Sequence, residues 1–97
     1  MAIQVTHTFT LPIGKVRYFQ TQPEISNLWW KLFDQEKIEV TKQVEVLDNG
    51  HKITLTTLWH NELDYQDFQS KIAGHTDAMN EYNRINNIEV TRVVKKL

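Results

Sequence analysis

Hydrophobic and polar residues alternate along residues 2–11. One side of this segment collects the apolar residues and one histidine, namely Ile3, Val5, His7, Phe9 and Leu11. The other side collects Gln4, Thr6, Thr8 and Thr10. A period of two is typical of a strand with one buried and one solvated face. We therefore expect a strand whose inner face carries His7.

The next apolar pattern has the spacing of a helix. Apolar residues recur at intervals of three and four in the order Ile25, Leu28, Trp29, Leu32 and Phe33. This spacing predicts one buried helical stripe. Thr21 is expected to cap the helix, with Glu24 three residues later completing a capping box. Trp30 lies off the stripe.

Residues 37–47 and 52–60 alternate again and predict two further strands. Between them, Asn49-Gly50 is the strongest turn signal in the chain, because both residues tolerate positive φ. It predicts a two-residue type I′ hairpin with Val46 opposite Ile53. This register places every apolar residue of the two strands on the same face.

Residues 61–83 predict a second helix, capped by Asn61 or Asp64. Glycine weakens helical structure, so Gly74 leaves open whether this segment is one helix or two. One side of the helix collects Tyr65, Phe68, Ile72, His75, Met79 and Tyr82. Asn86-Asn87 should end it, and residues 88–97 predict a last strand.

The predicted order is β-α-β-β-α-β within one domain, residues 1–97. Right-handed crossovers would arrange this order as a four-stranded antiparallel sheet, 4-1-3-2, with both helices on one face. The fold class is thus α+β and ferredoxin-like. The opposite sheet face is rich in threonine, a polar residue that favours strands. Either water solvates this face, or two copies of this short chain bury it in a homodimer.

Residues 58–68, from Leu58-Trp59-His60 to Phe68, resemble a strand-ending tryptophan followed by a capped helix in the dimeric α+β barrel superfamily. That group includes antibiotic-biosynthesis monooxygenase-like, muconolactone isomerase-like and stress-responsive barrel proteins. The resemblance covers nearly the whole chain in element order, although residues 12–22 are longer than usual. It implies a ferredoxin-like homodimer in the form of a dimeric α+β barrel, and a small apolar or aromatic ligand.

Composition narrows the chemistry. The 97 residues contain no cysteine, which excludes disulfides, thiolate metal sites and thiol nucleophiles. With 11 basic and 12 acidic residues, the net charge of −1 shows no footprint for nucleic acid or for an anionic membrane. The histidines lack metal-binding spacing, so we expect neither a metal nor a cofactor. Without an apolar span or a signal peptide, a cytoplasmic protein is expected.

Candidate site residues come from the predicted space between sheet and helices. His7 and His75 are acid/base candidates, because an imidazole titrates near neutral pH. Trp29, Trp59 and Tyr65 are candidate ligand-binding walls. For all five residues, ordinary core packing is the competing interpretation. Trp30, off its stripe, is a candidate interface residue.

Two functional hypotheses remain open. The first is a small oxygenase or isomerase without a cofactor that acts on an apolar ring compound. The second is a non-enzymatic dimeric module that holds a small molecule or a protein partner. A closed pocket with both histidines directed into it would favour the enzyme, whereas an exposed apolar patch alone would favour the module.

Overall fold

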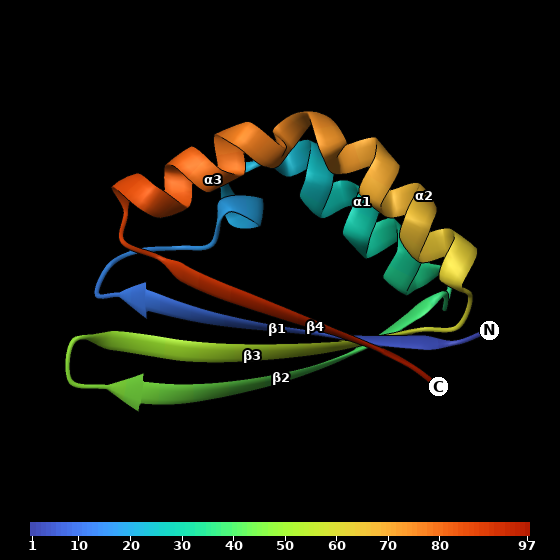
Figure 1. The fold of residues 1–97 in the computed structure, drawn as a ribbon, viewed down its shortest axis with the longest axis horizontal. Helices are drawn as coiled ribbons and strands as arrows, with labels where there is room; N and C mark the ends of the chain where they lie inside the picture. The colour runs from blue at the N-terminus through green and yellow to red at the C-terminus, as the bar shows by residue number, and fades with distance from the viewer.

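A single four-stranded antiparallel sheet carries all helical segments on one of its faces (Figure 1). The computed structural model describes all residues, 1–97. The strands are β1 (Ile3–Pro12), β2 (Ile38–Leu47), β3 (Gly50–Trp59) and β4 (Glu89–Lys96). The α-helices are α1 (Pro23–Asp34), α2 (Glu62–Ile72) and α3 (Thr76–Ile85), and short 3₁₀ helices occur at η1 (Tyr18–Thr21) and η2 (Ala73–His75). The order β2-β3-β1-β4 confirms the ferredoxin-like topology.

An aromatic cluster joins α1 and α2 to one end of the sheet. Trp59, only 1 % exposed, lies in its middle. Its ring centroid is 5.9 Å from that of Trp29, 5.7 Å from that of Phe68 and 5.2 Å from that of Tyr65. These large side chains supply most of the apolar surface removed from water. Ile3 and Val5 of β1 complete this part of the core.

The second helical region is an arch of three pieces that spans the length of the sheet (Figure 1). Asn61 caps its start, accepting a hydrogen bond of 2.9 Å from the Leu63 backbone. The sequence left open whether the helix breaks at Gly74, and the structure shows that it does, since η2 separates α2 from α3 there. The predicted inner side is also confirmed: Tyr65 and Phe68 are buried, and the later members of the series are half-buried.

The predicted cap of the first helix is wrong. Thr21 lies in η1, where its hydroxyl donates to the Tyr18 carbonyl at 2.6 Å. Gln22 is the N-cap and makes no side-chain capping bond. The helix starts with Pro23 in its first turn, where the missing N–H costs nothing. The Thr21 hydroxyl is used in a local hydrogen bond within η1 and is therefore not used to cap α1.

Shortly after the last residue of both α1 and α3, the chain contains a residue with positive φ. Glu36, with φ of 57°, follows α1, and the Lys37 N–H donates to the Leu32 carbonyl at 3.0 Å. Asn87, with φ of 55°, follows α3, where the expected asparagine stop is confirmed. This pattern is the Schellman motif, which satisfies the last helical carbonyls. It turns the chain sharply from α1 into β2 and from α3 into β4.

The hairpin register differs from the prediction by two residues. Val44, not Val46, lies opposite Ile53, and Leu47 pairs with Gly50, so that Asp48 and Asn49 form the loop. Neither loop residue nor Gly50 has positive φ, which rules out a type I′ turn. A shift of two preserves the face of every side chain, so the face sorting is correct although the register is wrong.

Gly50 is needed for a different reason. A Cβ atom at this position would lie 1.9 Å from the Leu11 carbonyl oxygen. The end of β1 is therefore packed tightly beside its antiparallel partner, the start of β3. Just beyond β1, the Ile13 N–H donates to the Asn49 carbonyl at 3.1 Å. Only glycine allows this approach. The contact with β1 fixes the hairpin, whereas the local sequence alone would favour a two-residue loop one position later, at Asn49-Gly50.

None of the helices is long and apolar enough to cross a membrane.

Candidate functional site

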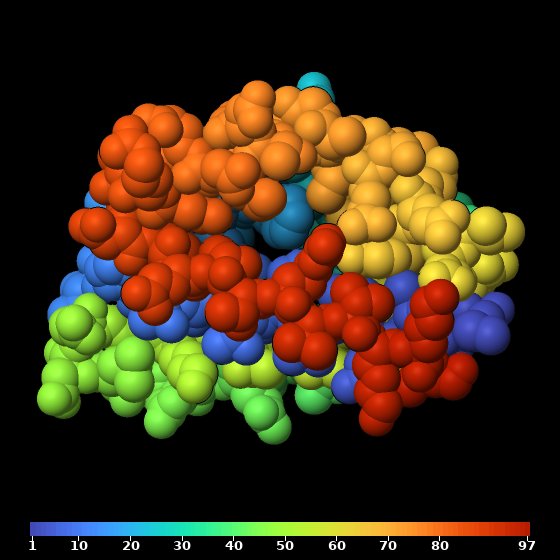
Figure 2. Space-filling view, in the orientation of Figure 1, coloured from blue at the N-terminus to red at the C-terminus, as the bar shows by residue number.

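The helical arch leaves the inner side of β4 uncovered. Val90 and Val94, which share that side with Arg92, remain 39 % and 45 % exposed. Figure 2 shows the surface hollowed here, between the orange helices of the arch and the red strand β4. We call this space between the arch and β4 the arch hollow. Arg92 of β4 and Tyr65 of α2 are hydrogen-bonded between its two sides, and His7 lies opposite Arg92 on the neighbouring strand β1.

A side-chain bridge crosses from β4 to α2. Arg92 Nη1 donates to the Tyr65 hydroxyl at 3.2 Å, and Gln69 Nε2 donates to the same oxygen at 3.1 Å. The Tyr65 ring is buried in the aromatic cluster, so that its hydroxyl forms the polar end of an otherwise apolar wall. Because the tyrosine oxygen is uncharged, Arg92 keeps its full positive charge beside the hollow.

A second polar contact joins η1 to η2. The Tyr18 hydroxyl lies 2.9 Å from His75 Nδ1 and forms a hydrogen bond with it. The Tyr18 ring packs edge-on against Tyr82 of α3, with ring centroids 5.6 Å apart. Tyr82 in turn donates its hydroxyl to the Val16 carbonyl at 2.7 Å. The long segment between β1 and α1 is thereby tied beneath the arch.

His7 lies on the inner side of β1, directly opposite Arg92 of β4 in the sheet register. Its imidazole stacks on Phe9, with ring centroids 5.8 Å apart, and makes no hydrogen bond within the chain. Burial and, to a smaller extent, the positive charge of Arg92 lower the pKa of His7 to about 4. At neutral pH the ring is uncharged, with a nitrogen able to accept a proton or a hydrogen bond.

Arg17 occupies the other end of the His7–Phe9 stack. Its guanidinium carbon lies 5.6 Å from the centre of the Phe9 ring, a cation–π arrangement. The Nε atom is buried without any hydrogen-bond partner. Burial lowers the pKa of this guanidinium from its usual value. An unsatisfied buried donor of this kind is costly in a native protein and therefore informative.

The sequence-predicted residues fall into three groups. His7 lies in the sheet layer on β1 and His75 in the helical layer at η2, and no hydrogen bond or ring contact joins them. Trp29 and Trp59 pack in the aromatic cluster, while Tyr65 contributes its ring to the cluster and its hydroxyl to the hollow.

Trp30 is 58 % exposed on α1 and packs edge-on against Phe33, with ring centroids 5.7 Å apart.

The sequence reasoning did not single out Arg17 or Arg92. A signal for Arg92 was present, because it interrupts the apolar side of the last strand between Val90 and Val94. Arg17 carried no comparable signal, since its segment has no regular period. Only the packing of η1 under the arch brings it against Phe9.

Two other depressions are less suited to a ligand. One lies between α1 and α2, where Lys37 pairs with Asp64 at 3.8 Å and Lys71 with Asp67 at 3.0 Å. Of its charged side chains, only Lys31 has no ionic partner. The other is a shallow depression on the uncovered sheet face, beside Gln4 and Leu58.

Comparison with known proteins supports the fold alone. The sequence matches no protein-family model and no curated protein. The de novo designed protein Foldit4 is similar in structure, with a TM-score of 0.59 at 9 % identity over 100 % of this chain and 99 % of that one. A putative antibiotic biosynthesis monooxygenase from Bacillus cereus gives a TM-score of 0.47 at 14 % identity, covering 99 % and 92 % of the two chains. A hydroxynitrile lyase from Passiflora edulis gives 0.45 at 12 %, covering 97 % and 94 %. At such identities the similarity concerns fold, not activity.

Proposed function

We propose that this chain forms a homodimer that binds a small, flat, apolar molecule in the arch hollow and moves a proton on it with His7. The observation that carries the proposal is a half-buried, uncharged imidazole without a hydrogen-bond partner beside an unneutralised arginine. Neither ring nitrogen of His7 is a fully buried atom, so an imidazole nitrogen without a partner in the chain is open to a hydrogen bond from a ligand.

The walls of the hollow suit an apolar ring. Val90 and Val94 offer exposed apolar surface on the inner side of β4, next to the Phe9–His7 stack. Small-molecule sites typically combine such surface with a few placed polar groups. Here those groups are the His7 imidazole, the Tyr65 hydroxyl and the Tyr18–His75 pair.

The chemistry that this arrangement favours is an isomerase-like proton transfer that needs no cofactor. A free nitrogen of His7 takes a proton from an acidic C–H or O–H bond of the ligand, and the electron pair of that bond stays on the ligand. The resulting anion lies beside Arg92, whose charge stabilises it. Return of the proton to another carbon completes an isomerisation without an oxidant or reductant.

A hydroxyl-bearing aromatic probe tests the binding step. Uncharged 2-naphthol should shift the NMR signals of the His7 ring, because its O–H can donate to the imidazole. His7→Phe keeps a flat ring on Phe9 and should preserve the fold while weakening binding about tenfold, the worth of one buried hydrogen bond. His51→Gln, at an exposed position of β3, serves as the control and should bind as the wild type does. Equal binding by His7→Phe would contradict the proposal.

The homodimer rests on the composition of the uncovered sheet face. Its two middle rows carry no charged residue, and they comprise Thr41, Thr56, Thr6 and Val93 in one row and Gln43, Thr54, Thr8 and Thr91 in the next. Charged residues lie only in the rows on either side, at positions such as Glu39, Lys95 and Glu45. An uncharged centre with a charged rim is the usual anatomy of a protein interface.

A further inference from the structure

We infer that the ligand of the arch hollow is an anion, a flat apolar molecule bearing a carboxylate or a similar negative group, held by Arg92 and Arg17. This inference deepens the proposed function and rests on it. It concerns the class of substrate that the hollow selects. If uncharged and anionic ligands bound equally well, this inference would fail while the proposed function would stand.

The first argument is that the two arginines on the inner side of the sheet lack an acidic partner. Neither Arg17 nor Arg92 takes part in any ion pair of the chain. They flank one stack of rings, with Arg17 over Phe9 and Arg92 opposite His7. Arg17 is half-buried, and a buried guanidinium without a counter-charge is unfavourable unless something negative binds beside it. Arg92 is exposed on β4, and its charge is open to an anion from solvent.

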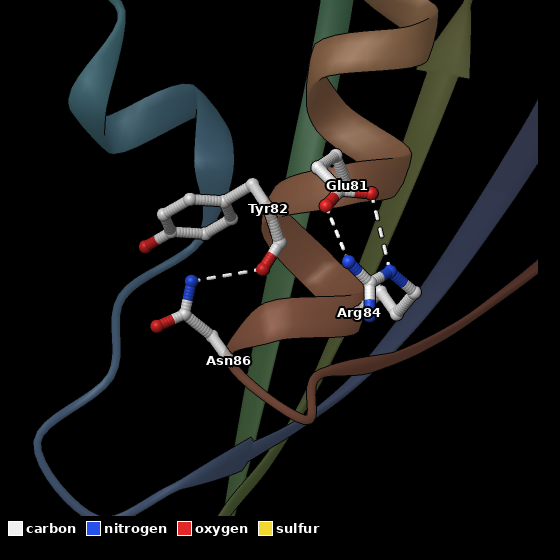
Figure 3. A network of polar contacts seen from close by, with 4 residues as sticks. All are labelled: Glu81, Tyr82, Arg84 and Asn86. Atoms are coloured by element: carbon white, nitrogen blue, oxygen red, sulfur yellow. Dashed lines mark hydrogen bonds and ion pairs between the residues drawn. The ribbon is translucent and has the colours of Figure 1, made fainter.

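The third arginine of the chain, Arg84, is a contrast to Arg17 and Arg92, because it has an acidic partner. Arg84 lies on the outer side of α3, 71 % exposed, where its guanidinium pairs with both carboxylate oxygens of Glu81 (Figure 3). Asn86 closes the same helix end by donating to the Tyr82 carbonyl at 2.8 Å (Figure 3). The outer arginine is thus neutralised, and the two inner ones are not.

The second argument is that both guanidinium groups have N–H donors without an acceptor in the chain. Arg92 uses one N–H on the Tyr65 hydroxyl, and no other bond of its guanidinium fork is made within the chain. Arg17 keeps a buried Nε–H without any acceptor. A guanidinium fork matches the two oxygens of a carboxylate, which accept hydrogen bonds and carry the charge. The apolar surface of Val90 and Val94 beside Arg92 suits the rest of the molecule.

The test compares two probes that differ in charge and hardly in shape. Binding of 2-naphthoate and of uncharged 2-naphthamide is measured at pH 7 by the NMR shifts of the His7 ring and by calorimetry. We expect the naphthoate to bind at least tenfold more tightly to the wild type. Arg92→Met should remove this preference and leave amide binding unchanged. Arg17→Met should reduce the preference, and Arg84→Met, the matched control, should retain it in full.

A second readout is specific to the site. An anion beside Arg92 offsets the charge that helps to keep His7 unprotonated, so the pKa of His7 should rise when 2-naphthoate binds and stay unchanged with 2-naphthamide. Equal affinity for both probes in the wild type would overturn the anion inference while leaving the proposed function intact. Failure of both probes to bind would overturn both. A preference for naphthoate that survives Arg92→Met and Arg17→Met together would place the anion elsewhere and also overturn the inference.

Discussion

At the scale of single residues, the charge state of His7 is the main consequence of the fold. The strand pattern places this imidazole among apolar neighbours, and the sheet register places Arg92 opposite it. Both effects oppose protonation, with burial as the larger one. Because the unfolded chain would protonate His7 near pH 6.5, the unfolded state binds more protons than the native state between that pH and about 4.

Stability should therefore fall with acidification in this window. Since the native pKa is depressed, the full contribution is present above pH 6.5 and is lost as the pH falls toward 4. The loss from His7 alone should amount to about 2–3 kcal/mol of unfolding free energy. Urea denaturation at pH 7 and pH 4.5 measures it.

His7→Phe should lose correspondingly less stability over the same pH range, whereas His51→Gln should follow the wild type. Identical pH dependence of the wild type and His7→Phe would show that His7 titrates normally in the native state.

At the scale of elements, the β2–β3 hairpin shows how a neighbouring strand can override a turn signal. Asn49-Gly50 is a strong local signal for a type I′ loop, yet the loop is Asp48-Asn49. The end of β1 presses its Leu11 carbonyl against Gly50, so the glycine belongs to the strand. The register of this hairpin is thus set by a contact between residues about 40 positions apart in the chain.

Two glycine replacements separate close approach from mere chain flexibility. Gly50→Ala should destabilise the protein by about 1–3 kcal/mol, because its Cβ would overlap the Leu11 carbonyl and force the strands apart. Gly74→Ala meets no atom within 4 Å and lies in the helical arch without positive φ. It should be neutral or stabilising by up to about 1 kcal/mol. Urea denaturation followed by tryptophan fluorescence measures both, and a neutral Gly50→Ala would contradict the observed strand contact.

At the scale of the whole molecule, one side of the sheet remains without a layer. The helices cover a single face (Figure 1), and every residue of β4 is exposed. The radius of gyration of 13.7 Å exceeds the value of about 12.5 Å expected for a compact chain of this length. A second copy packed on the threonine-rich rows would add the missing layer and bury more apolar surface per residue.

We expect light scattering at micromolar concentration to give about 23 kDa, twice the chain mass of 11.5 kDa. Thr56→Lys should shift the mass to that of one chain, because the two-fold symmetry of a dimer would place two new charges in an uncharged centre. Gln66→Lys, on the exposed side of α2, serves as the control and should leave the mass unchanged. A wild-type mass near 11.5 kDa would refute the dimer.

Periodicity determined the element order and the inner and outer sides of each strand, and the right-handedness of crossovers then determined the strand order of the sheet. These features follow from which residues avoid water, and that preference is written locally into each segment. The helix stop at Asn86-Asn87 was equally readable, since it depends on the backbone preference of single residues. Gly74 marked a possible break, and only the structure decided that the helix divides there. His7 was predictable as an inward-facing histidine for the same reason.

Tertiary structure alone decided the hairpin register, the cap of α1 and the surroundings of His7. The Leu11 carbonyl lies so close to Gly50 that it fixes the position of this glycine in β3. The Thr21 hydroxyl donates to the Tyr18 carbonyl within η1, so it does not cap α1. Arg17 and Arg92 meet one ring stack only because η1 folds beneath the arch and β4 pairs with β1. Such contacts join residues far apart in the chain, and their energies depend on distances that no local pattern encodes.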